Sequence, residues 1–168
     1  MAVDQALLES VAAGAPPVLR LYRWRPACLS FGRNQAAAGI YNESRARLLG
    51  IGIVRRPTGG LSVLHDAELT YAVVAPAAML GGPRAAYHAI NRALAMGLQD
   101  LGIPAELAGG ARRTSVTAAF RGAQPCFALP AGGEVVVNGR KLVGSAQRVE
   151  RRTILQHGSI LLDGSQAT

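Results

Sequence analysis

Asn138 and Gly139 stand between two runs of strand-forming residues, "GEVVV" before them and "RKLVGSAQR" after them. An Asn-Gly pair flanked in this way is the strongest short-range signal of a β-hairpin, because both residues tolerate the positive φ of a type I′ turn. The pair therefore predicts two antiparallel strands over residues 133–148, and this part of the chain is expected to lie in a sheet.

The rest of the chain shows short strand patterns and a few helical ones. Apolar spacing predicts helices over residues 2–13, 41–50 and 84–101. Apolar or alternating runs predict strands over residues 18–24, 27–32, 51–54, 69–76 and 153–162. Residues 106–125 have weak periodicity and many small side chains, which is typical of a surface loop. Together these patterns indicate an α+β fold with a mixed, mostly antiparallel β-sheet flanked by helices.

The length and composition favour one soluble domain. A chain of 168 residues is long enough for a single core, and no internal repeat divides it, so we expect one domain over residues 1–168. Charged residues make up 17% of the chain and no run of eighteen apolar residues occurs, so no membrane span is expected. The first residues, "MAVDQALLES", carry acids and lack a basic segment before an apolar one. They do not resemble a signal peptide, so a cytoplasmic location is expected.

The net charge of +8 favours acidic partners. The arginines occur singly and in pairs and do not form one stripe, and few aromatic residues lie among them. A nucleic-acid site usually needs such a stripe, so an acidic protein partner is the preferred interpretation.

The two cysteines have different surroundings. They lie far apart in a chain without a signal peptide, so no disulfide is expected. Cys28 lies in an apolar strand pattern and is expected in the core. Cys126 follows the predicted loop and precedes the hairpin, so two readings stay open: a buried small side chain, or a nucleophile activated by nearby positive charge.

Lys141 is the only lysine beside seventeen arginines. An ammonium group can bind a carbonyl oxygen, and unlike a guanidinium it can change its protonation state when it is desolvated. The position on the hairpin gives the side chain a defined direction. The alternative is a lysine retained by chance on a solvated turn.

The stretch "RRPTGGLSVLHD", residues 55–66, combines two arginines, a Gly-Gly pair and a His-Asp pair. Glycines let a backbone approach a ligand closely, while the side chains offer a cation and an imidazole. The spacing matches neither of the common glycine-rich nucleotide motifs. Taken alone, the stretch could equally be an ordinary glycine turn.

Five segments, read in order, resemble the lipoate-protein ligase and octanoyltransferase family, which shares a superfamily with biotin protein ligase. They are "MAVDQALLE", "RRPTGGLSVLHDAELTYAVV", "CF", "GRKLVGSAQR" and "LQHGSILL". The resemblance implies the mixed sheet and flanking helices of that superfamily. Family members usually have a further strand before the first helix and a further segment after the "GSILL" strand, so this chain looks truncated at both ends relative to the family.

The resemblance also implies a reaction. ATP-dependent ligases of the family typically carry an Asn-Asp pair ahead of the hairpin, whereas one octanoyltransferase branch carries "CF", as Cys126 and Phe127 do here. It implies Cys126 and Lys141 as catalytic residues, the cysteine as acyl acceptor and the lysine as partner of the acyl carbonyl. It implies substrate binding by Arg56, Gly59, Gly60, His65, Gly144, Ser145, Ala146 and His157.

On this resemblance the chain takes an octanoyl or lipoyl group from acyl carrier protein, or from another lipoyl protein, and passes it to a lysine of a lipoyl domain. The acceptors are the glycine cleavage H protein or a 2-oxoacid dehydrogenase E2. No metal and no cofactor are expected, and the protein is expected to be a monomer. Two alternatives remain: an ATP- and Mg-dependent lipoate ligase working through an acyl-adenylate, and a non-catalytic homologue that only binds acidic carriers.

Overall fold

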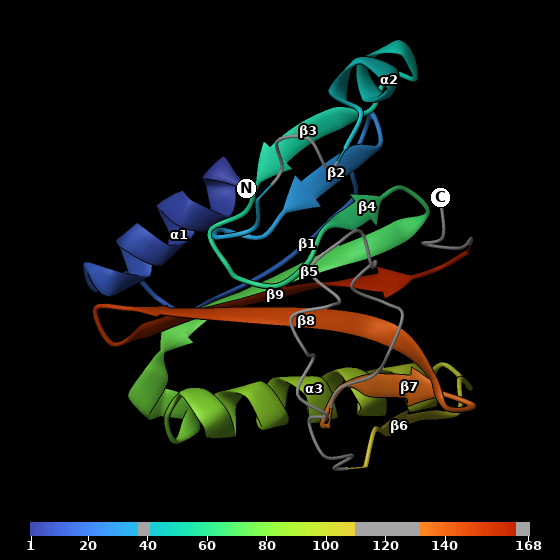
Figure 1. The fold of residues 1–168 in the computed structure, drawn as a ribbon. Coiled ribbons are helices and arrows are strands. Elements are labelled where there is room, and N and C mark those ends of the chain that lie inside the picture. The colour runs from blue at the N-terminus through green and yellow to red at the C-terminus, as the bar shows by residue number, and fades with distance from the viewer. Residues whose placement is uncertain (37–40, 110–131, 164–168) are drawn as a thin grey trace.

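A six-stranded sheet runs through the molecule, as the computed structural model shows (Figure 1). The structure describes residues 1–36, 41–109 and 132–163. The sheet has the order β1-β5-β9-β8-β7-β6, and every neighbouring pair is antiparallel. Its strands are β1 (Val18–Tyr22), β5 (Glu68–Pro76), β6 (Ala105–Leu107), β7 (Val135–Val137), β8 (Arg140–Glu150) and β9 (Thr153–Leu161).

A second, three-stranded sheet lies beside the first and has the order β3-β2-β4. The central strand β2 pairs in parallel with β3 and antiparallel with β4. The strands are β2 (Cys28–Phe31), β3 (Gly52–Arg55) and β4 (Val63–His65). The fold is therefore α+β with mostly antiparallel strands, as predicted, but the sequence patterns did not reveal that the strands divide into two sheets.

The predicted hairpin is confirmed. Val137 at the end of β7 pairs with Arg140 at the start of β8, so the loop contains only Asn138 and Gly139. Both have positive φ, 50° and 72°, as a type I′ turn requires.

Helices cover both faces of the six-stranded sheet. The helix α1 (Ala2–Ala12) packs on β5 and β9, while α3 (Pro83–Asp100) packs on β6, β7 and β8 (Figure 1). Alternate residues of β5 divide between the two layers: Tyr71 and Ala75 join the cluster with α3, whereas Ala72 and Val74 join the cluster with Leu8 of α1. Full burial of an aliphatic side chain as large as Leu8 or Val74 stabilises the fold by about 1.5–3 kcal/mol. The remaining helices are α2 (Glu43–Leu48) and the 3-10 helix η1 (Ala77–Leu80).

The prediction of a loop over residues 106–125 is wrong at its start, where β6 lies. Only one of the three side chains of β6 is buried, so the strand has no apolar alternation to reveal it. It forms because its backbone pairs with β7. Residues 110–125 lie outside the described part of the chain.

Among the described residues, the structure contains no helix with the length and apolar character needed to cross a membrane.

Candidate active site

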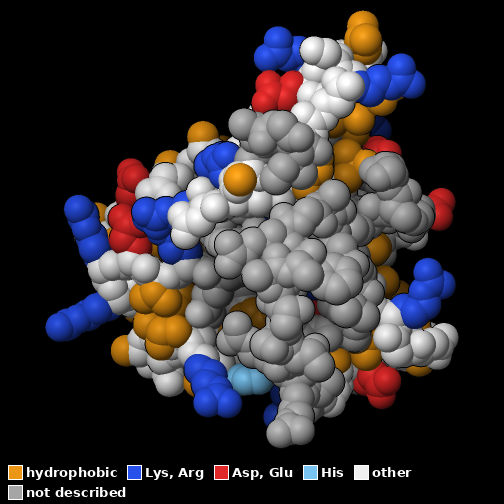
Figure 2. All heavy atoms as spheres, viewed as in Figure 1, with side chains coloured by type: hydrophobic (Ala, Val, Ile, Leu, Met, Phe, Trp, Pro, Cys, Tyr) orange, Lys and Arg blue, Asp and Glu red, His pale blue; other side chains and the backbone are white. Residues whose placement is uncertain are grey.

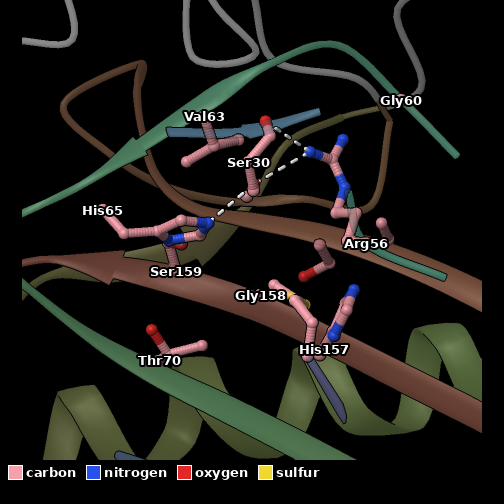
Figure 3. Close-up of a pocket in the computed structure, with 13 residues that line it drawn as sticks. Ser30, Arg56, Gly60, Val63, His65, Thr70, His157, Gly158 and Ser159 are labelled. Atoms are coloured by element: carbon pink, nitrogen blue, oxygen red, sulfur yellow. Dashed lines mark hydrogen bonds between the residues drawn. The ribbon is translucent and has the colours of Figure 1, made fainter. Parts of the chain in front are cut away.

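A cavity lies where the two sheets meet, lined from β2 and β4 on one side and from β8 and β9 on the other (Figure 3). Seven residues that the resemblance implied for substrate binding line it: Arg56, Gly60, His65, Gly144, Ser145, Ala146 and His157. These residues come from one loop, between β3 and β4, and from the three strands β4, β8 and β9, so only the folded sheets bring them together. Gly59 and Lys141 are not among the described residues that line the cavity.

His65 is the centre of a buried polar network in the cavity wall. Its Nδ1 lies 2.7 Å from Glu68 Oε1, and its Nε2 lies 2.7 Å from Ser30 Oγ. A carboxylate only accepts hydrogen bonds, so Nδ1 carries a proton toward Glu68, and in this tautomer Nε2 accepts the Ser30 hydroxyl. The indole of Trp24 stacks on the imidazole with ring centroids 4.6 Å apart, which holds the ring in its plane.

The Arg56 guanidinium ties the loop after β3 to β2. It donates to the carbonyl oxygens of Gly59 and Leu61 at 2.9 and 2.6 Å, and to both Ser30 O and Ser30 Oγ at 3.2 Å. Figure 3 shows Arg56 and Ser30 joined across the upper wall of the cavity. Arg56 is almost fully buried, so its bonds shape the Gly59–Gly60 turn as well as giving the cavity a positive charge.

Two glycines let backbones approach closely beside the cavity. A Cβ on Gly32 would lie 1.9 Å from Gly60 O, and one on Gly158 would lie 2.2 Å from Gly144 O. Real Cβ atoms essentially never come within 3.0 Å of another heavy atom. The close packing of the Gly59–Gly60 turn and of β9 on β8 therefore depends on the missing side chains.

His157 connects the cavity to the first helix. Its Nδ1 lies 3.0 Å from Asp4 Oδ2, and its Nε2 lies 2.6 Å from Thr58 Oγ1. Burial lowers the pKa of His157, although the Asp4 carboxylate acts in the opposite direction. Burial alone would raise the pKa of Asp4, but the hydrogen bond and charge of His157, with Arg20, hold it below its usual value. The pair fixes α1 against β9 and orients the Thr58 loop.

Ser145 belongs to a second buried network on the α3 side. Its Oγ donates to Asn91 Oδ1 at 2.9 Å and lies 2.8 Å from Tyr71 Oη. Gln156 donates to Tyr71 Oη at 3.2 Å. Burial raises the pKa of Tyr71 to about 12, so the phenol is neutral and serves as a hydrogen-bonding group.

Lys141 lies near the turn of the β7–β8 hairpin and is buried. Its Nζ lies 2.8 Å from Glu134 Oε1, and the two side chains are 3% and 7% exposed. The lysine is therefore not a solvated residue on a turn. A buried ammonium beside a carboxylate is held in one place, because breaking such a pair leaves an uncompensated charge.

The structure tests the prediction for one of the two cysteines. Cys28 is buried in β2, and burial raises the pKa of its thiol, which agrees with a core residue. Cys126 lies outside the described residues.

Sequence reasoning missed several polar residues of these networks: Asp4, Ser30, Glu68, Thr70 and Ser159. Ser30 and Thr70 lie within apolar strand patterns. The sequence signal that could have identified them as site residues is a polar side chain at a position that the strand pattern directs inward. Glu68 directly follows "HDA". A charged residue at the start of an apolar strand is expected to face solvent, and only the structure shows that Glu68 pairs with the buried His65. In the described part of the chain, no group of three or more His, Cys, Asp or Glu side chains is placed to hold a metal ion.

The chain is similar to a described protein family over its whole length. The family is the lipoyl protein ligase A/B catalytic domain, which matches residues 1–168. In structure the chain resembles a crystal structure of lipoate-protein ligase A bound with ATP, with a TM-score of 0.78 and 24% sequence identity. That alignment covers 98% of this chain and 61% of the other, and it supports the fold.

Curated relatives share more of the sequence. The octanoyltransferase LipM of Kyrpidia tusciae is 45% identical over 167 residues, which are 97% of this chain and 61% of the relative. The octanoyltransferase LipM of Moorella thermoacetica is 44% identical over 96% of this chain and 60% of its own length. The chain thus spans about three fifths of the curated relatives that it matches.

Proposed function

Since the chain belongs to the lipoyl protein ligase A/B catalytic domain family, we propose that it transfers an octanoyl group to the ε-amine of a lysine. The observation that carries the proposal is the identity of 44–45% with curated octanoyltransferases over nearly all of this chain. The cavity is consistent with it, because seven residues implied by the family resemblance line one space.

The donor in this proposal is octanoyl-acyl carrier protein, and the acceptor is a lipoyl domain of the glycine cleavage H protein or of a 2-oxoacid dehydrogenase E2. The charge of +8 suits acidic partners, since complementary charge speeds encounter. On the face shown in Figure 2, the Lys and Arg side chains of the described residues are scattered and form no single stripe. That distribution suits a protein partner better than a nucleic acid. We propose that residues 1–168 form one catalytic domain, which acts in the cytoplasm without a second copy of the chain.

The proposed reaction has two steps and uses no cofactor. In the first, the Cys126 thiolate attacks the donor thioester, and the octanoyl group passes from one sulfur to another. In the second, the lysine amine attacks the acyl-enzyme to form an amide and releases the thiol. Lys141 stabilises the negative charge that develops on the acyl oxygen. The loss of one such donor typically lowers the rate by about 10²–10³-fold. The buried Glu134 carboxylate, 2.8 Å from Lys141 Nζ, keeps that ammonium in place.

Intact-mass spectrometry tests the proposal directly. The protein is incubated with octanoyl-acyl carrier protein, and we expect an added octanoyl group that hydroxylamine removes. Cys126→Ser removes the thiol and should form no hydroxylamine-labile adduct, while Cys28→Ser, which changes the buried core cysteine, serves as the matched control and should still form it.

A wild-type protein that forms no adduct would contradict the proposal. So would ATP-dependent release of pyrophosphate with free octanoate and full activity of Cys126→Ser, since those results belong to an adenylating ligase.

A further inference from the structure

Ser30, His65 and Glu68 form a continuous hydrogen-bonded chain in the cavity wall. Glu68 Oε1 accepts from His65 Nδ1 at 2.7 Å, and His65 Nε2 accepts from Ser30 Oγ at 2.7 Å. Ser30 and His65 both line the cavity, whereas Glu68 stands behind the histidine. A hydroxyl, an imidazole and a carboxylate in this order are the arrangement that activates a hydroxyl or moves a proton in many enzymes.

We infer that these three hydrogen-bonded residues accept a proton from the incoming lysine amine. Ser30 contacts the amine, His65 takes the proton through the Ser30 hydroxyl, and Glu68 positions His65. The inference rests on the proposed octanoyl transfer and adds its proton acceptor.

Aminolysis of a thioester needs such an acceptor. A lysine amine has an ordinary pKa of about 10.4, so at neutral pH it is almost entirely an ammonium without a free electron pair. A histidine is the side chain best matched to accept a proton near neutral pH. Both buried histidines stand between a carboxylate and a hydroxyl, but Ser30, the hydroxyl partner of His65, lines the cavity, whereas Thr58, the hydroxyl partner of His157, is not among the described residues that line it.

The network restricts His65 to this role. The carboxylate of Glu68 sets the Nδ1–H tautomer, which leaves Nε2 as the acceptor. Thr70 donates to Glu68 Oε1 at 2.6 Å and itself accepts the Trp24 indole N–H at 2.9 Å, so the ring that stacks on His65 also braces its carboxylate. The remaining oxygen, Glu68 Oε2, is buried and has no hydrogen-bond partner among the residues that the structure describes. A buried carboxylate in that state is stabilised when a positive imidazolium forms beside it.

The step balances without any further reactant. The amine nitrogen bonds to the acyl carbon, and the C–S bond breaks. Two protons leave the ammonium nitrogen. The first passes to Ser30 Oγ while the Ser30 proton passes to His65 Nε2, so the hydroxyl is unchanged, and His65 then releases this proton to solvent. The second leaves along the same path once the C–N bond has formed and is returned to the leaving thiolate, so the products are the amide, the thiol and one solvent proton. Arg56 Nη1, 3.2 Å from Ser30 Oγ, favours electron density on that oxygen during the transfer.

The two half-reactions of the full chain separate this role from a structural one. Acyl-enzyme formation from octanoyl-acyl carrier protein is followed by intact mass, and the acyl-enzyme is then mixed with a lipoyl domain or with hydroxylamine, an amine that is already unprotonated at neutral pH. For Ser30→Ala, His65→Gln and Glu68→Gln we expect normal acyl-enzyme formation. Transfer to lysine should fall about 10²-fold or more, in kcat rather than in KM, while transfer to hydroxylamine should stay at the wild-type rate. His88→Gln, an exposed histidine on α3, is the matched control and should leave both transfers unchanged.

Transfer to lysine at the wild-type rate in these variants would overturn the inference. An equal loss of transfer to lysine and to hydroxylamine, or a loss of acyl-enzyme formation in all three variants, would also overturn it, because either result indicates a structural network. A wild-type protein that forms no acyl-enzyme would instead refute the proposed function, and the inference with it.

Discussion

Gly158→Ala adds one methyl group at the centre of the six-stranded sheet. Gly158 pairs with Tyr71 on β5 and with Ser145 on β8, so it has a neighbouring strand on each side. The new Cβ would lie 2.2 Å from Gly144 O and 2.7 Å from Tyr71 Cε1. The first contact is with backbone of the neighbouring strand, which cannot rotate away as a flexible side chain can.

The cost follows from the displacement that the methyl group demands. To bring the contact with Gly144 O to 3.0 Å, the shortest that Cβ atoms show, the two strands must separate by at least 0.8 Å. The hydrogen bonds between β8 and β9 and the buried Tyr71 resist that movement. Overpacking of this kind typically costs 1–3 kcal/mol, and we expect a loss of about 2–3 kcal/mol here because the obstacle is backbone. For a chain of this size the melting temperature should fall by roughly 4–12 °C.

Thermal unfolding followed by circular dichroism checks the prediction. Gly97→Ala is the matched control, since Gly97 lies in α3, is exposed, and a Cβ there meets nothing within 4 Å. Alanine in a helix interior should stabilise that variant by roughly 0.5–1 kcal/mol relative to glycine. If Gly158→Ala melts at the wild-type temperature, the close approach of β8 and β9 described above is wrong.

Two further predictions concern charged groups of the site. Lys141→Arg keeps the charge but cannot place a compact ammonium 2.8 Å from Glu134. The rate of octanoyl transfer to a lipoyl domain should therefore fall about 10²-fold or more. Full activity of this variant would show that Lys141 has no part in the mechanism. Because burial lowers the pKa of His157 in the folded state, the unfolded chain binds a proton there first, so stability should decline as pH falls below the ordinary histidine value of about 6.5. Urea unfolding at pH 7 and pH 5 should show a smaller pH dependence in His157→Gln than in the wild type, and equal slopes would contradict this assignment.

Local patterns predicted most of the secondary structure. The Asn138–Gly139 turn was correct because two adjacent residues with positive φ are sufficient to join neighbouring strands. The helix predicted over residues 84–101 lies within one residue of α3 at each end, because its apolar spacing is regular and Gly102, with a positive φ, can end a helix. β6 was missed because its pairing with β7, not its own side chains, makes it a strand.

The sequence also predicted part of the candidate site but not all of it. The resemblance to the family identified seven residues that line the cavity, because each of them lies in one of the quoted motifs. They did not identify Asp4 as the partner of His157, which is 153 positions away, or Ser30 as the partner of His65.

The sequence by itself determined the hairpin, most of the strand and helix segments and the family, because each of these depends on neighbouring residues or on short motifs; β4, β6 and η1 were not predicted. Only the tertiary structure decided which polar side chains share the cavity wall. Ser30 comes from β2, His65 from β4 and Gly158 from β9, and their distances follow from the registers of two separate sheets. The register of the six-stranded sheet is set by its packing against α1 and α3, and the contact of the two sheets is a tertiary one, so no local pattern encodes either.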